Sequence, residues 1–273
     1  TEIYTLSLHD ALPIWLEVYF SFADKTGRPV TVRVTESNRA KKKPFFLLAP
    51  VGVVSRQPAV LPVYSLFGMS FTKQKFTKIE ITIGGVMHKP DPFALPVDCS
   101  KNYFTRYSAD VFNVDWNPNF NGPLVPLFPG QNNTAEQNGT TFEIVHCDGH
   151  PEIKSMSARN RKHQVQIRFS PPFPDVACLN PDTDLSGEFV IQPDSPAGVI
   201  SGTYYLRSTG GEVTLHFSPA GGWQPGERRW ILKFLFFVVK IFKEWPKSYV
   251  WNARIQFNGG GNPVMQSEWA RME

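Results

Sequence analysis

Three residue types that can bind a metal stand within five positions, in the segment His146-Cys147-Asp148-Gly149-His150. Asp148-Gly149 predicts a two-residue hairpin turn. Such a turn places Cys147 and His150 opposite each other on one face of the hairpin, while His146 points to the other face. Only two side chains then converge, whereas a zinc site needs three or four ligands and no CxxC or HExxH pair supplies the rest. We therefore expect a structural hairpin with no metal and no cofactor, and Cys147 with His150 are the candidate metal ligands.

The same two residues also have the spacing of a nucleophile and its base. A Cys–His hydrolase needs in addition an oxyanion hole and a residue that orients the base, and no motif in the sequence marks either one. The sequence also lacks a G-x-S-x-G elbow, a Walker loop and a G-x-G-x-x-G turn between a strand and a helix. An enzymatic function therefore has to be inferred from residues that the fold brings together.

The segment from 103 to 116 is strand-like and rich in aromatic and polar side chains. Successive side chains of an extended chain alternate between two faces. If either face lines a cavity, its polar groups would orient an otherwise apolar ligand. The predicted ligand contacts are Tyr103, Arg106, Tyr107 and Trp116. The alternative is a solvent-exposed face on which the tyrosines shield the sheet.

An enzyme on the same scaffold is a second hypothesis. In it Asp110 or Asp115 acts as the acid or base, and His163 supports that group. The hypothesis requires at least two of these residues to converge within hydrogen-bond distance in a concave site. The alternative for His163, which lies in its own strand-like segment, is a structural histidine.

Alternating apolar and polar residues recur along most of the chain, as in a sheet with one buried face. Residues 16–22 and 30–34 predict a hairpin around a polar turn. Further strands are predicted at 45–54, 76–83, 103–116, 142–147, 163–169, 187–192, 199–207, 212–217 and 248–257. The 24 prolines and 20 glycines suit strands and turns better than helices. We predict an all-β, mainly antiparallel fold, either a barrel or a two-sheet sandwich, for which a lipocalin-like barrel is an analogy only.

One segment departs from this pattern and predicts a single apolar helix over about 227–245. Its charged residues form one narrow stripe that includes Phe236, and apolar residues cover the rest of the circumference. The apolar stretch is too short to span a bilayer. Either the helix packs across a barrel mouth or a sheet face, or it lies in a membrane interface. The predicted membrane contacts are Trp230, Phe234, Phe237 and Trp245.

The predicted organisation has three parts. Residues 1–14 resemble the peptide obtained when a sequencing-adapter read is translated, a contaminant of assembled metagenomic reading frames, so His9 and Asp10 are assigned no role. Residues 15–258 form a single β-rich domain, in which the stretch 122–139 is a long surface loop. Residues 259–273 form a flexible tail.

The net charge and the cysteine content limit which partners and which cellular compartment are expected. The net charge is +4, and the basic residues do not form a stripe interleaved with aromatics, so no nucleic-acid partner is expected. Three widely spaced cysteines favour free thiols in a reducing compartment, and hence a cytoplasmic or membrane-peripheral location. Two sequons, at Asn132 and Asn138, point instead to secretion.

These features predict a β-barrel whose aromatic cavity binds an apolar small molecule or lipid, in a protein that also contacts a membrane surface. The first alternative is an enzyme that modifies a lipophilic substrate on the same scaffold. The second is a structural or interaction β-sandwich without a pocket, which would expose an apolar patch.

Overall fold

The computed structural model describes residues 16–36, 44–53, 55–73, 77–88, 104–108, 110–194, 196–226, 229–257 and 262–272. The adapter-like segment 1–14 lies outside these residues. The chain divides into two compact units, and the single domain expected over 15–258 stays a prediction. Unit 1 comprises Thr1–Pro44 and Met69–Ser108, and unit 2 comprises Phe45–Gly68 and Ala109–Glu273. Strand β4 (Leu61–Lys73) is long enough to contribute its two halves to different units.

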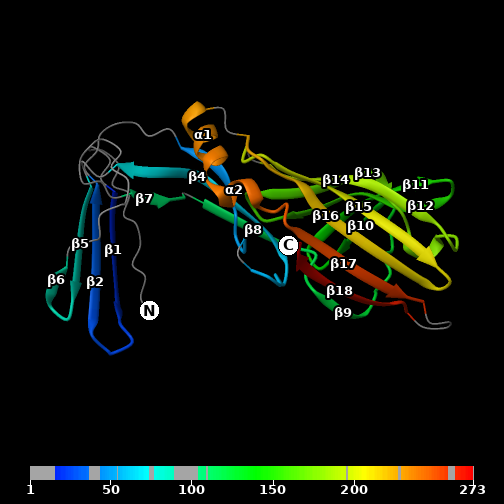
Figure 1. The fold of residues 1–273 in the computed structure, drawn as a ribbon, viewed down its shortest axis with the longest axis horizontal. Helices are drawn as coiled ribbons and strands as arrows, with labels where there is room; N and C mark the ends of the chain where they lie inside the picture. The colour runs from blue at the N-terminus through cyan, green and yellow to red at the C-terminus, as the bar shows by residue number, and fades with distance from the viewer. Residues whose placement is uncertain are drawn as a thin grey trace. The chain divides into compact units, whose positions relative to one another are not determined.

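Unit 1 contains an antiparallel sheet with the order β1-β2-β5-β6 (Figure 1). The strands are β1 (Leu16–Ala23), β2 (Pro29–Glu36), β5 (Thr77–Ile83) and β6 (Val86–His88). The hairpin predicted at 16–34 is confirmed, with Phe20 opposite Val32 and Asp24 in its turn. Asp24 accepts hydrogen bonds from Thr26 Oγ1 at 2.7 Å and from the backbone N–H of Arg28 at 3.0 Å. The Thr26 bond, with those from Arg28, holds the pKa of Asp24 well below its usual range.

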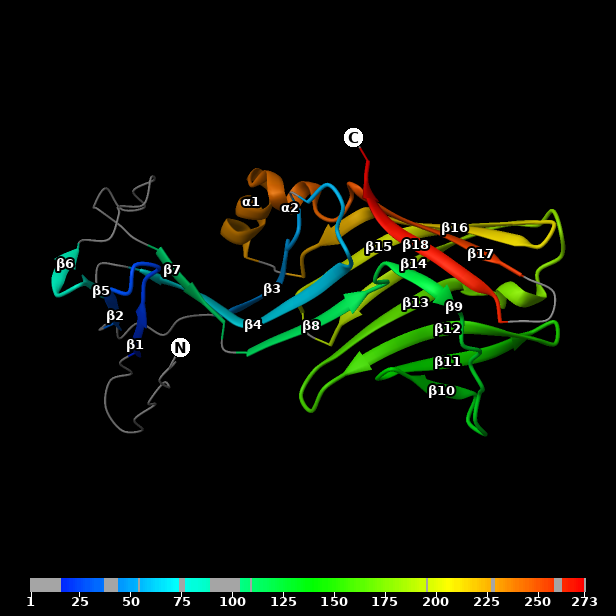
Figure 2. The ribbon, with the colours of Figure 1, turned by 90° about the horizontal axis from the view of Figure 1, so that it is seen from below.

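Unit 2 is built on an antiparallel sheet with the order β10-β11-β12-β13-β14-β15-β16-β17-β18-β9 (Figure 2). The strands are β9 (Phe120–Pro123), β10 (Thr134–Gln137), β11 (Thr140–Cys147), β12 (His150–Arg159), β13 (Gln164–Phe173), β14 (Asp184–Pro193), β15 (Val199–Thr209), β16 (Glu212–Gln224), β17 (Tyr249–Gln256) and β18 (Val264–Arg271). A 3-10 turn, η2 (Val176–Cys178), follows β13. The predicted all-β, antiparallel class is confirmed. The closed barrel is wrong, because β10 and β9 end the sheet and do not pair with each other in the described part of the chain.

A second, smaller set of strands completes unit 2. Strand β4 pairs with β3 (Phe45–Ala49), and its first half also pairs with β8 (Asp110–Trp116). Hydrogen bonds tie these strands to the large sheet: Trp269 Nε1 donates to the carbonyl of Asn117 at 2.6 Å, and the Tyr249 hydroxyl donates to the carbonyl of Gly52. The arrangement belongs to the sandwich alternative, in which two sets of strands enclose the core.

Six aromatic side chains of the large sheet pack against one another, and we call them the ring cluster. They are Phe169, Phe173, Phe189, Tyr204, Phe217 and Trp251. Neighbouring rings in this cluster lie 5.4 to 6.3 Å apart between centroids, within the range of direct aromatic contact. Tyr204 Oη donates a hydrogen bond to the carbonyl of Pro171 at 2.8 Å, and burial raises the pKa of Tyr204 to about 12.

Two predicted coil segments contain strands instead. The stretch 122–139, expected to be a loop, contains β10 and the end of β9, and Asn138-Gly139 forms the turn between β10 and β11. The predicted tail 259–273 contains β18, which pairs with both β17 and β9. Its period-two pattern is hidden because one of its buried positions is a serine, Ser267.

Candidate functional site

The predicted helical segment forms two short helices, α1 (Trp230–Val238) and α2 (Lys240–Glu244). Val239 separates them with an extended backbone, ψ 114°, and its N–H donates to the carbonyl of Leu235. The break rotates α2 relative to α1, so one helical wheel does not describe both. Glu227 and Arg228, at the predicted start, lie outside the described residues.

One side of α1 is anchored to unit 2. Leu232 and Phe236 are buried on this side. The Phe236 ring lies 5.0 Å from the ring of Trp223, in β16, and 5.0 Å from that of Phe242, in α2. Trp223 Nε1 donates to the carbonyl of Ala197 at 2.9 Å, which fixes the indole in place. Phe236, expected within a solvent-facing charged stripe, thus faces inward.

The opposite side of the two helices carries large apolar side chains that remain in solvent, and we call it the apolar face. Trp230 is 75% exposed, Phe234 63% and Phe237 67%. The other members are Ile231, Val238 and Ile241, at 60%, 55% and 41%. Helical residues at positions i, i+4 and i+7 share one side, so the three rings form one ridge. An ordinary surface helix turns such residues toward the core.

Three of the four predicted membrane contacts are exposed, and the fourth is buried. Trp230, Phe234 and Phe237 belong to the apolar face. The prediction for Trp245 is wrong, because this side chain is fully buried at 0% exposure just after α2. Among the described residues, no helix has the length and apolar character needed to cross a bilayer.

Lysines surround the apolar face. Lys233 is exposed in α1, next to Phe237 around the helix. Lys243 Nζ lies 4.2 Å from the centroid of the Phe237 ring, in cation–π geometry. Lys240 Nζ lies 3.4 Å from Glu244 Oε1, and the lysine side chain is 82% exposed. The face therefore combines aromatic rings with amine groups carried on long, flexible side chains.

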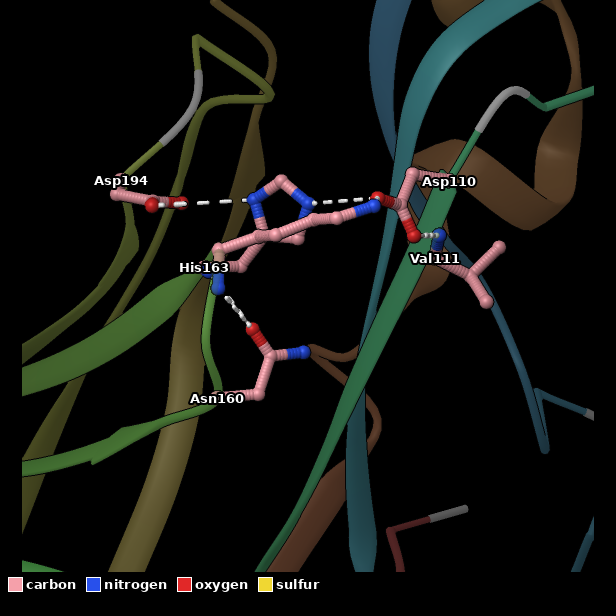
Figure 3. A network of polar contacts seen from close by, with 6 residues as sticks. Asp110, Val111, Asn160, His163 and Asp194 are labelled. Atoms are coloured by element: carbon pink, nitrogen blue, oxygen red, sulfur yellow. Dashed lines mark hydrogen bonds and ion pairs between the residues drawn. The ribbon is translucent and has the colours of Figure 1, made fainter.

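A polar network elsewhere in unit 2 contains two of the three predicted catalytic candidates (Figure 3). His163 Nε2 lies 3.4 Å from Asp110 Oδ2, and its Nδ1 lies 3.9 Å from Asp194 Oδ2. The imidazole is stacked on the Phe67 ring, with the centroids 3.5 Å apart. The side chain of Asn160 accepts hydrogen bonds from the backbone N–H groups of Lys162 and His163, each at 2.8 Å. The network joins β8, the turn before β13 and the turn after β14.

This geometry suits a structural link better than acid–base catalysis. Both ring nitrogens of His163 face carboxylates, so neither is directed at a substrate atom. Asp110 also accepts from Lys162 Nζ at 2.9 Å and from the backbone N–H of Val111. The Lys162 bond is the main cause that holds the pKa of Asp110 below its usual value. Asp110 and His163 thus lie within hydrogen-bond distance of each other, which is one of the two conditions of the enzyme hypothesis, whereas Asp115 is exposed and accepts from Asn113.

The structure places the predicted ligand contacts unevenly. Tyr103 lies outside the described residues, and Arg106 and Tyr107 belong to β7 (Phe104–Tyr107) in unit 1, where their side chains are not described. Trp116 is buried at the end of β8 in unit 2, opposite Leu61. Trp116 is thus a core residue, and the ligand contacts of the other three residues stay predictions.

The predicted hairpin at 148–149 is confirmed. Cys147 pairs with His150, and both turn residues have positive φ, 51° at Asp148 and 84° at Gly149. A hydrogen bond to Glu152 raises the pKa of the Cys147 thiol, which disfavours the thiolate that a nucleophile needs. The described residues contain no group of three or more His, Cys, Asp or Glu side chains that could hold a metal ion.

Several members of the polar network and of the apolar face have no signal in the sequence. Asp194, just after β14, and Phe67, in β4, lie far from His163 along the chain, and no local pattern signals their contact, because it depends on strand register. Ile231, Val238 and Ile241 lacked a signal because the segment is apolar nearly all round. The exposed sector follows from what Trp223 and Phe242 cover.

Fold and site together define an antiparallel all-β protein that presents a short, aromatic, lysine-flanked helix to solvent. No family model, no curated protein and no solved structure matches the chain. Its function is therefore argued from its own residues.

Proposed function

We propose that the protein binds lipid, at the surface of a bilayer, through the apolar face of α1 and α2. The observation that carries this proposal is that six large apolar side chains are exposed on α1 and α2, while the opposite side of α1 packs against the large sheet. An exposed apolar patch of this kind marks an interaction surface. Because α1 has nine residues and lies on a β scaffold, it suits the plane of the interface and not a spanning position.

The composition of the face favours a lipid interface. Tryptophan and phenylalanine partition to the boundary between headgroups and acyl chains, and lysine side chains extend from there to water. If about a quarter of the exposed area of these side chains leaves water, the gain is on the order of 5 kcal/mol. This is comparable to one acyl anchor, which supports weak and reversible membrane binding.

The sequence also predicts an aromatic cavity as a lipid site. The aromatic side chains of the ring cluster contact one another, with neighbouring ring centroids 5.4 to 6.3 Å apart. These contacts favour the apolar face as the place where lipid meets aromatic side chains.

The test is co-sedimentation of the full chain with vesicles of phosphatidylcholine and phosphatidylserine. The wild type is expected to sediment, and a double variant, Phe234→Ser with Phe237→Ser, to remain in solution. Both side chains are exposed, so the variant is expected to keep the fold, which circular dichroism checks.

A matched control is Phe128→Ser, because Phe128 is 80% exposed and lies between β9 and β10, away from the helices. The control is expected to sediment like the wild type. A double variant that sediments as well as this control would overturn the proposal. Concentration-dependent self-association without vesicle binding, abolished by the double variant, would also overturn it and indicate a protein partner.

A further inference from the structure

The helical segment carries a surplus of positive charge. Between 229 and 247 the basic residues are Arg229, Lys233, Lys240, Lys243 and Lys247. Glu244 is the one acidic residue in that range. The surplus of four equals that of the complete chain, which has 28 basic and 24 acidic residues and a net charge of +4. Acidic and basic residues are therefore equal in number over the rest of the chain, and the helical segment is one of its basic segments.

Three of these lysines lie on α1 and α2, where a surface bound to the apolar face would contact them. Lys243 lies against the Phe237 ring at 4.2 Å, and Lys233 is exposed one helical turn away. Lys240 is 82% exposed, although it pairs with Glu244. When the rings beside them insert into a bilayer, amines on long, flexible side chains can extend to the headgroup level.

We propose that the lipid surface recognised by this face is anionic, with the lysines contacting phosphate or carboxylate headgroups. This inference rests on the proposed function and specifies its partner. The apolar contacts alone give only reversible binding, and stable membrane association takes a second signal such as a basic patch. Each lysine near an anionic membrane strengthens binding about fivefold, so the three lysines of α1 and α2 give on the order of a hundredfold.

An aromatic surface with lysines could also bind a single-stranded nucleic acid, on which bases stack against rings. The aliphatic members of the apolar face argue against this partner. Ile231 and Val238 are exposed on α1 with the rings, Ile241 is exposed on α2, and branched aliphatic side chains offer no stacking surface. Acyl chains, by contrast, contact them as favourably as they contact the rings.

The experiment compares vesicles of phosphatidylcholine alone with vesicles that also contain phosphatidylserine, using the full chain. Binding to the anionic vesicles is expected to be about a hundredfold tighter at low salt, and to weaken as salt rises from about 0.05 M to about 0.5 M. The triple variant Lys233→Gln, Lys240→Gln, Lys243→Gln is expected to lose this preference.

A matched control removes three positive charges elsewhere in unit 2, with Lys154→Gln, Arg159→Gln and Arg161→Gln. These side chains are exposed and lie in β12 and the turn after it, four strands away from β16, the strand that α2 contacts. The control is expected to keep the preference, because net charge alone does not create it.

The outcomes separate the two proposals. Equal, salt-insensitive binding to both vesicles would overturn the anionic preference and leave lipid binding intact. Binding to neither vesicle would overturn the proposed function itself. Equal losses in the triple variant and its control would overturn the role of the helix lysines. Displacement from anionic vesicles by a single-stranded oligonucleotide at comparable concentration would assign the face to nucleic acid instead.

Discussion

The ring cluster and the apolar face are both made of large aromatic side chains, yet they differ in what surrounds each ring. Phe217, 6% exposed, contacts five other aromatic rings. Phe237, 67% exposed, contacts the amine of Lys243. A ring surrounded by protein contributes to folding, whereas a ring left in water contributes only when a partner covers it. The difference separates aromatic residues used for stability from those available for binding.

The largest expected effect of a substitution lies in the ring cluster. Phe217→Ala removes the ring shared by five neighbours and leaves a cavity, so we expect a loss of about 4 kcal/mol in the free energy of unfolding. The measurement is urea denaturation followed by far-UV circular dichroism. Phe237→Ala is the matched substitution on the apolar face and is expected to change stability by less than about 0.5 kcal/mol. Similar losses for both would contradict the distinction.

The two sides of α1 allow the same comparison within one helix. Phe236→Ala removes a ring packed on Trp223 and Phe242, and we expect it to cost about 3 kcal/mol. Phe234→Ala, two residues earlier and 63% exposed, is expected to be nearly neutral. A neutral Phe236→Ala would mean that α1 is not anchored to the sheet, and would remove the rigid platform on which the proposed function depends.

Local features of this fold could be predicted from the sequence. Asp148-Gly149 specifies its turn through its own two residues, and the alternation in 16–22 specifies a strand without reference to any partner. The stretch at β18 could not be recognised, because Ser267 occupies a buried position that the pattern expects to be apolar. The division into two units follows from the pairing of β4 with different strands along its length, which is information about register and not about propensity.

The candidate site was predictable in composition but not in orientation. The apolar and lysine-rich character of 229–247 is evident in the sequence. The buried sector is set by Trp223, in a strand that precedes the helix, and by the break at Val239. Trp245 and Trp230 are equally apolar, and only tertiary contacts make one fully buried and the other 75% exposed.

A smaller effect tests how tightly the ring cluster is packed. Gly187 lies opposite Tyr204 in the neighbouring strand, and a methyl group at this glycine would stand 2.5 Å from Tyr204 Oη. Gly187→Ala therefore has to displace the tyrosine ring and weaken its bond to Pro171, at an expected cost of about 2 kcal/mol. Calorimetric unfolding measures the change. A neutral result would show that the cluster can rearrange without cost, and would weaken its contrast with the apolar face.

The smallest expected effect concerns the hydroxyl of Tyr204, a polar atom within the ring cluster. Tyr204→Phe removes its hydrogen bond to Pro171, so we expect a loss of about 1 kcal/mol at neutral pH. Burial raises the pKa of Tyr204 to about 12, from about 10 for an unfolded tyrosine. The neutral phenol is thus favoured by folding, and the corresponding stability is present below pH 10 and lost as the pH rises to about 12.

The wild type is therefore expected to lose stability more steeply than Tyr204→Phe between about pH 10 and 12, as followed by urea denaturation at each pH. Tyr205 and Tyr249 also have raised pKa values, but they are present in both proteins, so the difference between the two slopes isolates Tyr204. Parallel slopes would mean that Tyr204 ionises as readily in the folded protein as in the unfolded chain. Water would then reach the ring cluster, and the ring cluster would be a second candidate lipid site, in addition to the apolar face.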